Sequence, residues 1–244
     1  MIIGVKYYMD PFNLIKIITA IITVIVAFTL GFRVLRLNPG EMLNRWFTLF
    51  FISSSIGFLT YTIYHLITPE SGISKDLIIP LMITTQICFN FIFISLVMTV
   101  FILEKYKKVA MSLKYFGTMI GIFIIMSFGY FIPIWTPSLN EGDWIQGYVN
   151  TDTPPPWFIF VNLLRTGLSI YVIYKYAMMT RKIEEETKKK VKWFFIGIIF
   201  AVVTLLINLI GGLIGGPFGS GLLEIIAIII VDIGIVAIFK AFLL

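Results

Sequence analysis

Long apolar runs alternate with short polar segments along the whole chain. Seven of these runs are long enough to cross a bilayer, which takes about 20 mainly apolar residues in a helix that rises about 1.5 Å per residue. We place the predicted spans at Phe12–Leu35, Trp46–Ile67, Leu77–Leu103, Tyr115–Trp135, Trp157–Met179, Val191–Gly215 and Leu222–Leu244. Lipid offers the backbone no hydrogen-bonding partner, so these runs must be helices. The pattern predicts an all-α, polytopic membrane protein, in which residues 1–244 form a single seven-transmembrane helix bundle.

The basic residues between the spans predict the orientation of this bundle. Fourteen lysines and arginines fall in the odd-numbered loops, and one, Lys75, falls in the even-numbered loops. Cytoplasmic loops carry the excess of basic residues in membrane proteins. We therefore expect the N-terminus outside and the C-terminus in the cytoplasm. Because the chain lacks the pattern of a cleavable signal peptide, we expect its first span to direct insertion into the cell membrane.

Composition narrows the classes of function. Hydrophobic residues make up 59% of the chain and charged residues 13%, whereas a soluble domain is about a quarter charged. The net charge of +6 is explained by the loops, so we expect membrane lipid and no nucleic acid as a partner. The sequence contains no nucleotide, zinc or nucleophile motif, and its single histidine excludes a multi-histidine metal or haem site. We expect neither enzymatic activity nor a cofactor.

Polar residues inside the predicted spans are the candidate functional residues. An ionisable residue within a span is unfavourable in lipid and indicates function unless it has a partner. The candidates are Tyr61 and His65 in span two, Gln86 and Asn90 in span three, Asn162 and Arg165 in span five, Asn208 in span six, and Glu224 and Asp232 in span seven. They indicate either interhelical hydrogen bonds that hold the bundle together, or an outward-facing pocket that binds a small molecule or ion.

The helical rise gives Arg165 two candidate partners. At about 1.5 Å per residue, its depth lies between those of Glu224 and Asp232. We therefore expect an ion pair between Arg165 and one of these acids. Two G-x-x-x-G spacings, Gly117 with Gly121 and Gly211 with Gly215, allow close approach between helices. We favour packing within the bundle over a dimer seam.

The fifth loop, residues 180–192, is the most strongly charged segment. Its acids precede lysines by three or four residues, which favours a helical extension. Lys188, Lys189 and Lys190 have two interpretations. They are either positive-inside topology determinants, or a docking surface for a cytoplasmic signalling protein or anionic lipid.

Two segments carry a resemblance to a known family. They are the proline-led entry to span five at Pro154–Trp157 and the charged hairpin that runs into Val191–Gly197. With the seven-span layout, they resemble the N-terminal seven-helix membrane region of certain histidine kinases. The resemblance implies a sensory role that precedes cytoplasmic signalling domains. Because this chain stops at Leu244, we expect it to signal through separate cytoplasmic partners.

We therefore favour a sensory, receptor-like module, and two other functions stay open. A small-solute transporter would suit the glycine-rich end of span six and the buried acid Asp232. A structural subunit of a membrane complex would suit the lack of a site motif.

The orientation can be tested by labelling single cysteines with an impermeant reagent in a Cys88→Ala background. Cysteines placed at Ser74 and Asn150 should react from outside the cell, and those at Lys108 and Glu185 should not. Protection of the Asn150 position in intact cells would reverse the predicted orientation.

Overall fold

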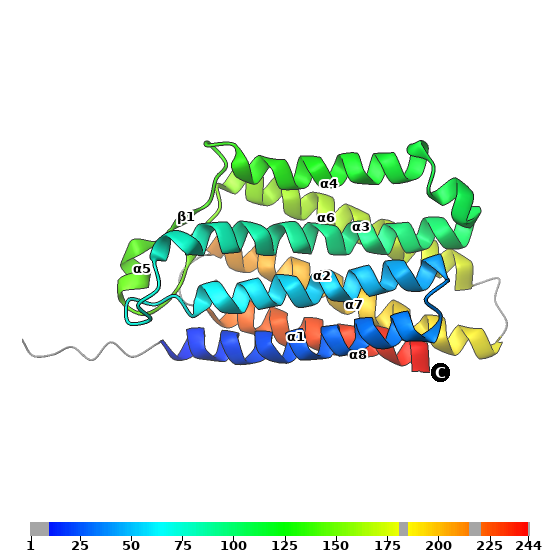
Figure 1. Cartoon of the computed structure of the whole chain (residues 1–244), viewed down its shortest axis with the longest axis horizontal. Helices are drawn as coiled ribbons and strands as arrows, with labels where there is room; N and C mark the ends of the chain where they lie inside the picture. Colours follow the sequence, from blue (N-terminus) through cyan, green and yellow to red (C-terminus); the bar gives the residue numbers. More distant parts are fainter. Residues whose placement is uncertain (1–9, 181–184, 215–220, 244) are drawn as a thin grey trace, which may run out of the picture.

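The computed structural model describes residues 10–180, 185–214 and 221–243, and it is a bundle of long helices (Figure 1). Within this part of the chain, seven helices are long and apolar enough to cross a membrane. Six of them are α1 (Pro11–Leu37), α2 (Met42–His65), α3 (Ile78–Ala110), α6 (Pro155–Thr180), α7 (Glu185–Ile214) and α8 (Glu224–Leu243). The other consists of α4 (Thr118–Phe128) and the helical turns on either side of it, Leu113–Phe131 in all. The predicted all-α bundle of seven spans is confirmed. The last residues of predicted spans six and seven, Gly215 and Leu244, lie outside the described residues.

Short elements connect the spans. The 3₁₀ turn Lys75–Leu77 precedes α3, while the π-helical turn Leu113–Gly117 and the 3₁₀ turn Gly129–Phe131 flank α4. The connection between α4 and α6 contains α5 (Glu141–Ile145) and two strands, β1 (Ser138–Leu139) and β2 (Thr151–Asp152), which pair antiparallel. Successive spans run in opposite directions, so the described chain begins at the end of the bundle that carries α5 and β1 and finishes at the other end (Figure 1).

Six of the helices form a ring. Neighbouring helices contact one another in the order α1, α2, α3, α6, α7 and α8, and α8 returns to α1. The remaining span, which contains α4, contacts α3 from outside this six-helix ring. The core has two parts. One is rich in aromatic residues such as Phe47, Tyr176 and Phe194, and the other includes Tyr61 and Trp157.

Helices α7 and α8 approach most closely at two glycines. A Cβ added at Gly197 would lie 2.5 Å from the carbonyl oxygen of Gly234, and one added at Gly234 would lie 3.0 Å from that of Gly197. Neither helix could come so near with a side chain in between. At Gly121 the predicted close contact within the bundle is absent, since a Cβ there meets nothing within 4 Å, and a dimer seam there stays a prediction. Gly215, of the other predicted pair, lies outside the described residues.

This contact gives a test of the packing. Gly197→Ala should lower the melting temperature of the purified protein, because overpacking a tight contact costs about 1–3 kcal/mol. Gly167→Ala is the matched control. Gly167 lies on α6, where an added Cβ meets nothing within 4 Å. Equal melting temperatures for the two variants would contradict the close approach.

Candidate functional site

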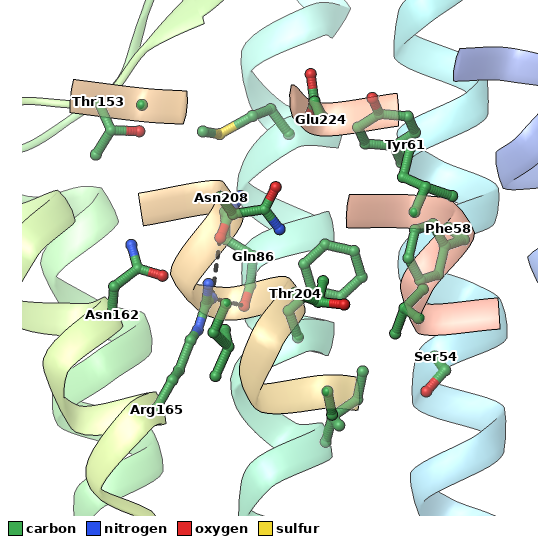
Figure 2. Close-up of a pocket in the computed structure, with 18 of the residues that line it drawn as sticks. Ser54, Phe58, Tyr61, Gln86, Thr153, Asn162, Arg165, Thr204, Asn208 and Glu224 are labelled. Carbon is green, nitrogen blue, oxygen red and sulfur yellow. Dashed lines mark hydrogen bonds between the residues drawn. The ribbon is translucent and has the colours of Figure 1, made fainter. Parts of the chain in front are cut away.

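A cavity of ≈ 360 Å³ lies inside the six-helix ring (Figure 2). All six ring helices line it, together with residues 149–153 of the connection between α4 and α6. Its volume is within the range of about 300–1,000 Å³ usual for small-molecule sites. Residues 149–153 belong to the same connection as α5, so the cavity begins at that end of the bundle and extends into the interior.

The lining changes from polar to apolar with depth. Polar side chains line the half nearer α5, and they are Lys16, Tyr61, Tyr64, His65, Gln86, Tyr130, Asn150, Thr151, Asp152, Thr153, Asn162, Arg165, Thr204, Asn208 and Glu224. Deeper in the bundle the lining is mostly apolar, and it includes Phe50, Ile92, Phe93, Ala201, Ile235 and Ile238. In Figure 2, Glu224 and Tyr61 lie toward the end with Thr153, and Ser54 lies at the opposite end of the view.

Arg165 is a buried cation in the wall of this cavity, and it makes several hydrogen bonds. Its side chain is 5% exposed. Nε and Nη2 donate to Oδ1 of Asn90 at 2.9 and 2.7 Å, and Nη2 also donates to Oε1 of Gln86 at 2.9 Å and to its backbone oxygen at 3.1 Å. Tyr130 lies beside the guanidinium as well. These contacts join α6 to α3 through an ionised donor and neutral acceptors.

Asn90 is held in place by the helix outside the ring. Its Nδ2 donates to the backbone oxygen of Met126 at 3.0 Å and to Oγ of Ser127 at 3.3 Å, both on α4. These two acceptors fix which end of the amide is the donor, so its oxygen is directed at Arg165. Thus α4 orients the site although it does not belong to the six-helix ring.

The predicted ion pair of Arg165 is wrong. Glu224 pairs instead with Lys16 on α1, and Asp232 accepts a hydrogen bond of 2.6 Å from Thr23, also on α1. Among the residues that the structure describes, no carboxylate forms a salt bridge with Arg165. Both acids lie on α8, and the rotation of this helix directs them toward α1 rather than toward α6.

Most of the predicted site residues do gather. Tyr61, Gln86, Asn162, Arg165, Asn208, Glu224 and His65 line the cavity. Asn90 touches Arg165 from behind. Asp232 belongs to the contact between α1 and α8 and is not part of the lining.

Lys16 is the main residue that the sequence analysis missed. Its side chain is 1% exposed, and its Nζ donates to the Tyr148 hydroxyl at 3.1 Å in addition to pairing with Glu224. A lysine five residues inside the first apolar run was itself the signal, because an ionisable residue in a span needs a partner. Tyr148 could not have been found in this way, since it comes from the connection between α4 and α6.

His65 is part of the wall of the cavity. Its Nδ1 lies 2.9 Å from the backbone oxygen of Tyr61, and its ring packs against Tyr61 and Tyr64 at centroid distances of 4.1 and 4.2 Å. Asn13 Nδ2 donates to the backbone oxygen of His65 at 2.7 Å. The histidine therefore ties the end of α2 to α1.

The charged segment before span six is helical where it is described. Helix α7 begins at Glu185 and includes Lys188, Lys189 and Lys190. Lys189 is exposed, whereas the side chains of Lys188 and Lys190 and all of residues 181–184 lie outside the described part of the chain. The docking surface predicted there stays a prediction.

Comparison of the chain with protein-family models, with curated proteins and with solved structures gives no match.

A double-mutant cycle tests the buried pair between Lys16 and Glu224. Glu224→Gln should lower the melting temperature more than Lys16→Met, because it strands a fully buried ammonium, whereas the Glu224 side chain is 28% exposed. Breaking a buried pair costs about 3–5 kcal/mol, and replacing both partners recovers part of that loss. Additive losses in the double variant would show that the two groups are not coupled.

Proposed function

We propose that this protein is a receptor-like module of the cell membrane, which binds a small molecule in its central cavity and signals through separate cytoplasmic partners. The observation that carries the proposal is Arg165, a buried cation in the cavity wall with only neutral hydrogen-bond acceptors around it. A charge inside a membrane protein without a counter-ion is unfavourable and marks a functional site. A ligand that completes its electrostatic environment would bind there.

The contacts of Arg165 also suggest how binding could be transmitted. The guanidinium joins α6 to α3 within the cavity, and Lys175 on α6 pairs with Glu104 on α3 at 2.8 Å nearer the other end of the same helices. A ligand that competes for the guanidinium changes the first contact. It thereby favours one relative position of α3 and α6 over another. The predicted orientation places the cavity outside and the pair of Lys175 and Glu104 toward the cytoplasm.

A small-solute transporter is the second candidate, supported by the depth of the polar lining. Transport requires access from both ends, and the half of the bundle beyond the cavity is filled with aromatic side chains. Phe194 packs against Phe47 and Tyr176 there, with ring centroids 5.3 and 4.3 Å apart. This packing supports a binding site that is closed toward the far end. A purely structural subunit has no need for a cavity of this kind.

The proposal predicts that small molecules stabilise the purified protein through Arg165. At a ligand concentration a hundred times its Kd, binding adds about 2.7 kcal/mol to the free energy of unfolding. A thermal-shift screen that includes anionic compounds should give ligands that stabilise the wild type and not Arg165→Gln. Arg33→Gln is the matched control, because Arg33 lies over the Phe239 ring at 5.3 Å and does not line the cavity.

Two results would contradict the proposal. If no compound in a broad screen stabilises the wild type, the cavity has no binding role. If proteoliposomes take up a compound found in the screen and the uptake saturates, the protein is a transporter rather than a receptor.

A further inference from the structure

We infer that the ligand is a single-chain amphiphile with an anionic headgroup, whose acid group binds Arg165 and whose hydrocarbon chain fills the apolar depth of the cavity. This inference rests on the proposed function and names the chemical class of the ligand. It follows from the charge of Arg165 and the polarity gradient of the same cavity.

The headgroup must be an anion because the cavity offers a cation that lacks one. A guanidinium has five N–H donors, and the bonds to Gln86 and Asn90 use those of Nε and Nη2. Tyr130 is a third neutral partner beside the guanidinium, so no acid among the described residues balances the charge of Arg165. Carboxylates and phosphates bind arginine through two parallel hydrogen bonds, which no neutral headgroup matches.

Other polar groups can complete the headgroup site. Asn208 on α7 also lines the cavity, and its amide can donate to an anion (Figure 2). Two acids line the cavity. Glu224 would repel an anion if it stood alone, but it is paired with Lys16 near the mouth. Asp152 belongs to β2, in the connection between α4 and α6, and is exposed. The uncompensated positive charge thus lies at Arg165, inside the bundle and away from the mouth.

The rest of the ligand must be apolar and elongated. Beyond Arg165 the cavity continues between Phe50, Ile92, Phe93, Ala201, Ile235 and Ile238. From Val231 to Ile238, both of which line it, α8 rises about 10 Å at 1.5 Å per residue. Water in such a space would lack hydrogen-bonding partners, so an alkyl chain is the better occupant. A small inorganic anion would leave this space unfilled.

Equilibrium binding of radiolabelled decanoate to the protein in nanodiscs tests the inference, with empty nanodiscs as the blank for partitioning into lipid. Decanol and acetate, as competitors, separate the contributions of head and tail. Decanoate should bind at least about tenfold more tightly than decanol, the loss expected for charge-assisted hydrogen bonds. Each methylene between acetate and decanoate should raise affinity by up to about fourfold. A parallel arm with decyl phosphate distinguishes a phosphate headgroup from a carboxylate.

Two variants address the two ends of the ligand. Arg165→Gln should weaken decanoate binding at least about tenfold and leave decanol unchanged. Ser54→Leu fills the deep end of the cavity, because Ser54 lies about one helical turn from Phe50 on α2 and both line it. It should therefore weaken decanoate binding and leave hexanoate binding unchanged. Melting temperatures confirm that both variants fold, and the comparison of decanoate with decanol on the wild type needs no variant.

The outcomes separate this inference from the proposed function. Equal binding of decanol and decanoate, or unchanged decanoate affinity in Arg165→Gln, overturns the anionic headgroup. Equal binding of acetate and decanoate overturns the chain. If compounds from the screen bind while decanoate and decyl phosphate do not, the inference fails and the proposed receptor stands. If nothing binds at all, both fail.

Discussion

The fold depends on the fact that lipid can neither solvate a charge nor accept a backbone hydrogen bond. Helix α1 shows the consequence. Its buried positions include Lys16 and Thr23, which find their partners on α8, whereas the isoleucines at 18 and 25 face outward. The buried charged groups of the spans therefore find their partners on neighbouring helices rather than in lipid. The polar cavity results from the same requirement that makes the outer surface apolar.

Two buried cations meet this requirement in different ways. Lys16 has an acid, Glu224, and a phenol, Tyr148, so its charge is balanced inside the protein. Arg165 has the amides of Gln86 and Asn90, which satisfy hydrogen bonds without balancing charge. The first arrangement holds α1 to α8. The second leaves a positive potential in the cavity, which is the physical basis of the proposed ligand site.

The two halves of the bundle serve different purposes. In the half that carries α5, helices enclose space and polar groups, and the connection between α4 and α6 contributes Tyr148 and residues 149–153. In the other half, aromatic rings such as Phe47 and Phe194 fill the ring, and α7 meets α8 closely at Gly197 and Gly234. The closed half provides a rigid base, while the contacts between α3 and α6 reach from the cavity into it.

The sequence alone determined the seven spans, their bounds to within seven residues, and seven of the polar residues that line the cavity. These features are local, because an apolar run and a helical period depend only on neighbouring positions in the chain. The order of the helices in the ring, the place of α4 outside it, and the partners of Arg165, Glu224 and Asp232 came only from the tertiary structure. The rise per residue fixes the depth of a side chain, whereas its neighbour depends on which helix lies beside it and how each is rotated. For this reason an acid at the right depth faced Lys16 instead of Arg165.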